Sequence, residues 1–151
     1  MAMPPPAKNN WSTGMCDWCA PPGGCGICLL ACLCPCCMYG QYGELMPPTV
    51  CCGGSCGGSC CAMYALSIIG VPCVLQMQAR GHLRMKYNIP GSACNDCCLT
   101  CWCSPCTMCQ EYRECHIRGM GKGGVDQGIA VAMSAPPAPQ AIDPAAPANK
   151  Q

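Results

Sequence analysis

Cysteine pairs separated by two residues recur along this chain, and they are its best candidates for chemistry. The sequence has 22 cysteines among 151 residues, and the pairs are Cys16/Cys19, Cys25/Cys28, Cys94/Cys97, Cys98/Cys101, Cys103/Cys106 and Cys106/Cys109. Two sulfurs at this spacing can bind one soft or borderline cation such as Zn(II) or Cd(II). The pattern therefore indicates metal coordination, although so many cysteines must produce some pairs by chance.

Two dense cysteine modules narrow the set of candidate ligands. One surrounds Cys34, Pro35 and Cys36, the other surrounds Pro105, and each joins proline and cysteine to an apolar segment. Their separation does not match a zinc ribbon or a zinc finger, so the prediction depends on thiol density. We predict that zinc or another soft divalent metal is the only cofactor. The predicted ligands are Cys28, Cys34, Cys36, Cys101, Cys103, Cys106 and Cys109.

Two other fates for the cysteines stay open alongside metal binding. Thiols near a membrane can carry palmitoyl chains, and the rest can pack in the core or form disulfides. Residues 1–10 place a proline run where a secretory signal needs its apolar stretch, so we expect reduced thiols. A disulfide-stapled extracellular protein would require unconventional export.

Composition and charge argue against two function classes. The net charge is +1 and there is no basic run, whereas nucleic-acid binding usually needs a basic face, so we expect no nucleic-acid partner. For acid–base catalysis the nearest candidates are Glu111 and Glu114 beside Arg113, which we interpret as a helix-surface ion pair. We therefore predict that the protein is not an enzyme.

Residues 60–79 form an uncharged, largely apolar run. It is long enough to cross a hydrocarbon core of about 30 Å as a transmembrane helix, or else to form a buried or re-entrant helix. Arg80, Arg84 and Lys86 follow it directly. These cations face the cytoplasmic leaflet if the run meets a bilayer, and otherwise form a solvated helix end.

Prolines and glycines divide the rest of the cysteine-rich region. Pro35 should end or kink a helix over residues 24–39, which then resembles a half-span or an interfacial hairpin. Glycines in residues 51–61 predict a flexible thiol-bearing loop without a core face. Ser92 is suited to cap a helix that begins at Ala93. That helix carries Cys94, Cys97, Cys98 and Cys101 on one face until Pro105 interrupts the pattern.

These features predict one mainly α-helical domain. We expect small cysteine-rich helical hairpins, bent at prolines, between disordered terminal tails. The predicted boundaries are a disordered N-terminus over 1–10, the cysteine-rich domain over 11–118, and a disordered Pro/Ala-rich tail over 119–151.

Two motifs resemble a known family. Residues 28–36 read Cys-Leu-Leu-Ala-Cys-Leu-Cys-Pro-Cys, and residues 103–114 run from a Pro-Cys unit into Gln-Glu-Tyr-Arg-Glu. Residues 11–17 and 84–91 add further landmarks. The chain thus resembles the cysteine-rich family of placenta-specific 8, cornifelin, plant cadmium resistance proteins and cell number regulators. The resemblance implies a membrane-associated protein, with plant members linked to cadmium tolerance, zinc movement and cell-number control.

Combined, the motifs and the thiols lead to two hypotheses about function. The first is a protein of the plasma membrane that handles divalent heavy metals through zinc or cadmium binding, tolerance or transport. The second is a palmitoylated membrane scaffold that regulates growth or signalling without transport. The expected partners are membrane lipids and divalent metal ions, and the sequence leaves the oligomeric state open, a homo-oligomer included.

Overall fold

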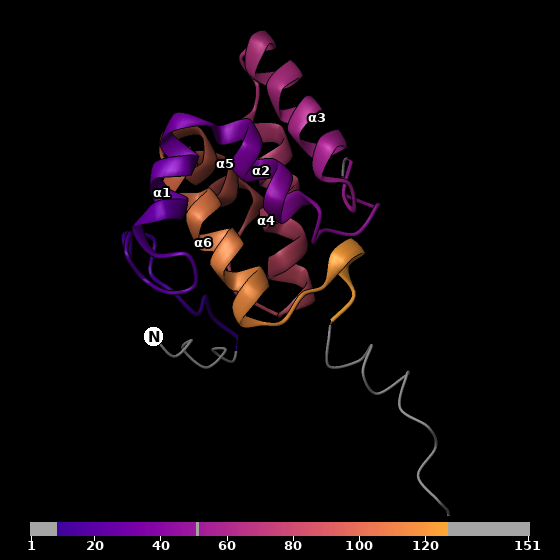
Figure 1. The fold of residues 1–151 in the computed structure, drawn as a ribbon. Coiled ribbons are helices and arrows are strands. Elements are labelled where there is room, and N and C mark those ends of the chain that lie inside the picture. The colour runs from indigo at the N-terminus through magenta and orange to yellow at the C-terminus, as the bar shows by residue number, and fades with distance from the viewer. Residues whose placement is uncertain (1–8, 51, 127–151) are drawn as a thin grey trace, which may run out of the picture.

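The computed structural model describes residues 9–50 and 52–126, and in these ranges it is built from α-helices without a named strand (Figure 1). The mainly α-helical fold predicted from the sequence is confirmed. In chain order the helices are α1 (Gly24–Leu33), α2 (Pro35–Gly43), α3 (Cys56–Ile69), α4 (Cys73–Lys86), α5 (Ala93–Trp102) and α6 (Ser104–Ile117), followed by the short 3-10 helix η1 (Lys122–Gly124).

Two prolines produce the predicted bends. Pro35 is the first residue of α2, and Pro105 lies in the first turn of α6. Proline is tolerated there because the first-turn N–H groups have no partner within the helix. The residue before each helix, Cys34 or Cys103, leaves helical geometry with φ of −142° or −133°. Consequently α1–α2 and α5–α6 are sharply bent helix pairs.

The continuous helix predicted over 60–79 does not form. Instead α3 ends at Ile69, because Gly70 adopts a left-handed φ of 85° and Pro72 precedes α4. A glycine in the left-handed conformation commonly ends a helix, and a proline commonly follows it because proline cannot continue that helix. Within residues 9–50 and 52–126, no helix combines the length and the apolar character needed to cross a membrane.

Caps explain where two further helices begin. The Ser92 hydroxyl accepts a hydrogen bond from the backbone N–H of Asn95 at 3.2 Å, as predicted for a helix starting at Ala93. Ser55 caps α3 in the same way by accepting from Gly58. The prediction of a flexible loop over 51–61 is therefore wrong from residue 56 onward. There the Ser55 cap stabilises a helix despite the glycines.

Sulfur and tyrosine fill the core of this phenylalanine-free protein. Met38, Tyr42, Leu75 and Met108 are each at most 1% exposed and pack where α2, α4 and α6 meet. Tyr39 packs edge-on against Tyr42, with ring centroids 5.0 Å apart. Flexible methionine side chains thus fill volume that aromatic rings usually occupy.

A charged network lies beneath the surface between α4, α5 and α6. Arg80 Nε lies 3.3 Å from Asp96 Oδ1, and its Nη1 lies 3.5 Å from Glu111 Oε1, with all three side chains at most 3% exposed. Arg84 also pairs with Asp96. Arg80 is thus neither a lipid-facing cation nor a solvated helix end. Burial raises the pKa of Glu111 to about 7, although the charge of Arg80 opposes the shift.

The surface ion pair predicted for α6 is also wrong. Glu111, Arg113 and Glu114 are all at most 1% exposed, because α6 is packed against α1, α2, α4 and α5. Arg113 donates instead to the carbonyl oxygen of Trp18 at 2.7 Å. Glu114 accepts a hydrogen bond from the backbone N–H of Ser12 at 2.8 Å. These residues therefore fasten the N-terminal segment to the bundle.

The fold continues past residue 118, where we expected the C-terminal tail to begin. Met120 is only 2% exposed, and Lys86 Nζ lies 2.9 Å from Asp126 Oδ1. Residues 119–126 are therefore packed onto the bundle. Most of the two predicted tails, residues 1–8 and 127–151, lies outside the described residues.

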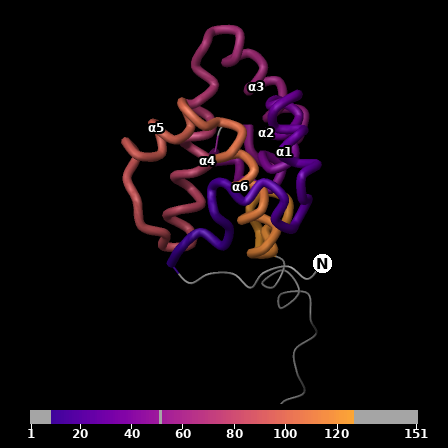
Figure 2. Tube along the Cα trace, turned by 90° about the vertical axis from the view of Figure 1, so that its left-hand side faces the viewer, coloured from indigo at the N-terminus to yellow at the C-terminus, as the bar shows by residue number. Residues whose placement is uncertain are grey.

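The junctions α1–α2, α3–α4 and α5–α6 lie toward the same end of the bundle, which is uppermost in Figures 1 and 2. The tip of α3 projects farthest. Exposed apolar side chains gather on these junctions, including Leu33, Ile68, Ile69 and Trp102, which is 90% exposed. We call these four residues and their junctions the apolar end. The surrounding sequence, residues 18–43, 45–79 and 97–110, contains no Asp, Glu, Lys or Arg.

Candidate metal centre

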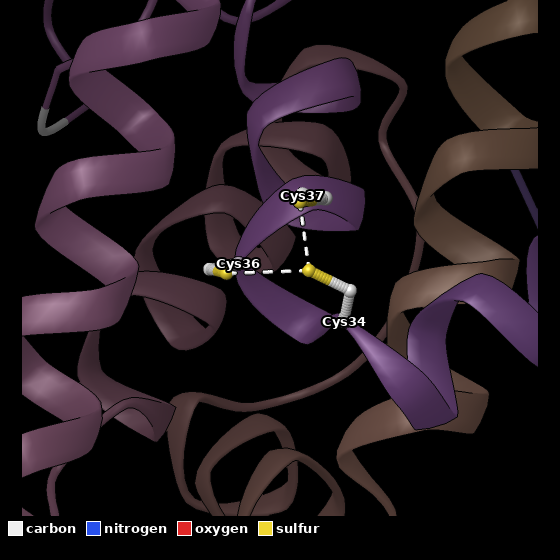
Figure 3. Close-up of side chains that lie close together, drawn as sticks. All are labelled: Cys34, Cys36 and Cys37. Atoms are coloured by element: carbon white, nitrogen blue, oxygen red, sulfur yellow. Dashed lines mark hydrogen bonds between the residues drawn. The ribbon is translucent and has the colours of Figure 1, made fainter.

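Three thiols meet where α1 turns into α2. Cys34 Sγ lies 2.7 Å from Cys37 Sγ and 3.6 Å from Cys36 Sγ (Figure 3). All three sulfurs lie within 4.8 Å of one another. Within residues 9–50 and 52–126, no other group of three or more potential metal ligands lies this close together. The α1–α2 junction is therefore the candidate metal centre.

The local sequence explains why these thiols converge. Cys34 is the N-cap of α2, and Pro35 starts the helix, so Cys36 and Cys37 follow in its first turn. The backbone N–H groups of a first helical turn are free of helix partners and carry partial positive charge, which favours a nearby anion. The helix terminus thus helps to stabilise thiolates at this position.

The three thiols differ in acidity because they share hydrogen bonds. The pKa of Cys34 is lowered, chiefly by its hydrogen bond with the Cys37 thiol, with help from a hydrogen bond to the backbone of Cys37. The same interaction with Cys34 raises the pKa of Cys37 to about 12. Burial is the main cause of a raised pKa at Cys36. Cys34 is accordingly the first of the three to become a thiolate.

A fourth thiol approaches from α3. The Cys60 thiol is half-buried and within hydrogen-bonding reach of the Cys36 thiol. Gly40, one turn after Cys36, permits this approach: a Cβ atom there would lie 3.2 Å from Cys60 Cβ and 2.9 Å from the Cys56 carbonyl oxygen. Figure 3 shows Cys36 on the side of α2 that is nearest α3.

The other predicted ligands do not come together in one site but lie in separate thiol pairs. Cys28 and Cys109 are hydrogen-bonded to each other between α1 and α6, so one thiol contact does join the two modules. Cys106 is hydrogen-bonded to Cys103. Burial raises the pKa of both Cys106 and Cys109 to about 12.

Cys101 lies apart from the two thiol pairs of α6. Its thiol is hydrogen-bonded to that of Cys73, which raises the pKa of Cys101 to about 12. Of the seven predicted ligands, the structure therefore places only Cys34 and Cys36 in the α1–α2 cluster.

Sequence reasoning missed two members of this thiol group. Cys37 directly follows Cys36, so the Cys-Pro-Cys-Cys run itself offered a signal. Cys60 offered no such signal, because it was assigned to a flexible loop and reaches the site only through the packing of α3 on α2.

One disulfide changes the interpretation of two predicted ligand pairs. Cys19 is bonded to Cys25, which separates Cys19 from Cys16 and Cys25 from Cys28. The expectation of reduced thiols is wrong for this pair. The three thiols of the candidate centre are free.

Comparison with known proteins assigns the chain to a family. The model of the PLAC8 family matches residues 11–114, a range that contains the candidate centre and the buried motif of α6. The chain belongs to the PLAC8 family. The recognition made from the two cysteine motifs is therefore confirmed.

Several plant proteins are similar to the chain. Cell number regulator 4 of Zea mays is 35% identical over 121 residues, covering 79% of this chain and 74% of its own length. The protein Plant Cadmium Resistance 2 of Arabidopsis thaliana is 36% identical over 117 residues, covering 76% and 72%. Cell number regulator 11 of Zea mays is 38% identical over 117 residues, covering 76% and 70%. No solved structure matches significantly.

Proposed function

We propose that this PLAC8-family protein binds a soft divalent metal ion, Zn(II) or Cd(II), as cargo through Cys34, Cys36 and Cys37. The observation that carries the proposal is the convergence of three free sulfurs within 4.8 Å. Thiolates select soft and borderline cations over Mg²⁺ or Ca²⁺, which prefer oxygen ligands. The donor set therefore fits a thiophilic ion.

Cys60 is the thiol best placed to complete the coordination sphere. Closed thiolate sites for zinc are usually tetrahedral with four ligands, and Cys60 already contacts Cys36. Binding by four thiols releases four protons and leaves the site with two negative charges. The N-terminus of α2 offsets part of that charge.

The names of two relatives agree with this proposal. Plant Cadmium Resistance 2 and Plant Cadmium Resistance 1 of Arabidopsis thaliana are 36% and 35% identical to this chain. Other relatives are named cell number regulators, a name that does not mention a metal. For this chain we propose capture of the ion, which would lower its free concentration.

The first prediction concerns loss of these ligands. The double variant Cys34→Ser/Cys36→Ser should bind Cd(II) about tenfold or more weakly than the unchanged protein, because a hydroxyl is a poor ligand for a soft cation. Equilibrium dialysis of the reduced full chain measures the affinity. Cys60→Ser should show a smaller loss.

Matched controls distinguish this site from general thiol density. Cys61→Ser removes an exposed thiol beside Cys60, and Cys94→Ser/Cys98→Ser removes two exposed thiols from α5. Both should leave the tightest Cd(II) affinity unchanged. Equal losses in the α5 double variant and the α2 double variant would refute the assignment.

We further propose that the apolar end docks on a lipid bilayer, which is the membrane association expected from the sequence. It is supported by the clustering of exposed apolar side chains on three junctions, within stretches that carry no charge. Tryptophan is suited to the membrane–water interface, and Trp102 is the most exposed of these residues. The thiols of Cys32 and Cys101 are free and exposed near these junctions, which supports the alternative proposal that the protein is palmitoylated there.

The second prediction tests this docking with purified, unacylated protein. Ile68→Asp/Ile69→Asp should weaken binding to phosphatidylcholine–phosphatidylserine vesicles by about tenfold or more, because apolar side chains lose their contact with lipid. Met85→Asp is the matched control: Met85 is 77% exposed but lies near the far end of α4. Vesicle flotation gives the bound fraction. Absence of binding by the unchanged protein, or an equal loss with Met85→Asp, would contradict the docking surface.

A further inference from the structure

A second thiol pair at a helix start lies outside the candidate metal centre. Cys103 is the N-cap of α6, and Pro105 and Cys106 are the second and third residues of the helix, in its first turn. The backbone N–H of Thr107 donates to the Cys103 carbonyl oxygen at 3.0 Å, which fixes the start of the helix. The thiols of Cys103 and Cys106 are hydrogen-bonded to each other. Their positions three residues apart across a helix start are compatible with a disulfide.

The two thiols differ in their access to solvent. Cys103 is partly exposed, whereas Cys106 is only 9% exposed and lines a small recess with Trp18, Cys109 and Arg113. Burial favours the neutral thiol at Cys106. An accessible attacking thiol therefore lies beside a protected second thiol.

From this geometry we propose that Cys103 and Cys106 form a redox-active dithiol that reduces disulfide substrates by thiol–disulfide exchange. The Cys103 thiolate attacks one sulfur of the substrate, its S–S bond breaks, and the first substrate thiol leaves. Cys106 then loses its proton and attacks Cys103 Sγ, which forms the Cys103–Cys106 disulfide and releases the second substrate thiol. Two electrons pass from the protein to the substrate in this reaction.

The pair is separate from the three thiols of the candidate metal centre. In the described part of the chain, three potential metal ligands come together at Cys34, Cys36 and Cys37, and not around Cys103 and Cys106. The dithiol is therefore distinct from the metal centre.

Oxidised glutathione is a direct probe of this activity. The reduced full chain is exposed to it, quenched with acid, alkylated and digested with chymotrypsin, so that mass spectrometry reports on residues 103–112. Cys103 and Cys106 should become disulfide-bonded at least about tenfold faster than Cys94 and Cys97, which have the same spacing within α5. Cys106→Ser should stop at a glutathione adduct on Cys103, and Cys103→Ser should abolish the fast reaction.

The outcomes separate this proposal from metal binding. Cys34→Ser/Cys36→Ser should retain the fast exchange, so failure of the metal proposal would leave it intact. Circular dichroism of each variant verifies that the helices are retained. An equal rate at Cys94 and Cys97, a fast reaction that survives Cys103→Ser, or no adduct on Cys103 in Cys106→Ser would overturn the proposal.

Discussion

Replacing Arg80 with alanine should lower the free energy of unfolding by about 3–5 kcal/mol, because the change leaves buried carboxylates without their cation. Arg80 lies between Asp96 and Glu111, and its guanidinium also stacks 4.1 Å from the ring centroid of Trp11. A domain of this size is usually stable by about 5–15 kcal/mol, so the loss is a large fraction of the total. Urea denaturation followed by circular dichroism measures it.

The pH dependence of this loss follows from Glu111. Its pKa of about 7 lies above the ordinary value of 4.5, so the folded state holds the proton more tightly and Glu111 contributes less stability as pH rises from 4.5 through 7. Arg80 opposes this shift, so its removal should raise the pKa of Glu111 further. The Arg80→Ala variant should therefore have a lower free energy of unfolding at pH 8 than at pH 5. Lys122→Ala is the control: its pair with Glu44 is 70% exposed at Lys122, so water screens the pair and its loss should change stability little. Similar effects of the two variants would show that the buried network does not support the fold.

The affinity for Cd(II) should rise steeply with pH, by at least about a hundredfold per unit near neutrality. The pKa of Cys37 is about 12 and that of Cys36 is raised, so both thiols are protonated at neutral pH and each loses one proton on binding. Every displaced proton changes the affinity about tenfold per pH unit by mass action. Cys34 contributes less to the slope because its pKa is lowered.

Competition with a chelator of known protonation behaviour measures this slope between pH 6 and pH 8. The Cys34→Ser/Cys36→Ser variant is the control, and its remaining Cd(II) binding should depend less on pH. An affinity of the unchanged protein that stays constant over this range would show that the ion does not displace thiol protons at this site.

Local signals in the sequence were sufficient to predict the bends and caps of the fold. Pro35 and Ser92 act through their own backbone geometry and hydrogen bonds, and their effects were predicted correctly. Gly70 and Pro72 gave the same kind of signal, but the hydropathy of residues 60–79 favoured a single helix. The turn geometry of Gly70 and Pro72 prevailed because a helix cannot continue through it.

Tertiary packing decided the features that the sequence could not predict. Glu111 and Arg113 have the composition of a helix surface, yet α6 is surrounded by four other helices and its polar residues pair inside. Cys34 and Cys36 were found through a local motif, whereas Cys60 joins them from a distant helix through the close approach at Gly40. Even the division of the predicted ligands among separate places depends on the arrangement of helices, which thiol spacing does not specify.

X-ray absorption spectroscopy of the zinc-loaded full chain tests the central claim most directly, because it reports the atoms bound to the ion. The proposed centre predicts a shell of sulfur atoms at about 2.3 Å, with sulfur lost from that shell in the Cys34→Ser/Cys36→Ser variant. A shell of nitrogen or oxygen at about 2.0–2.2 Å, or a sulfur shell unchanged in this variant, would contradict metal binding at the junction of α1 and α2.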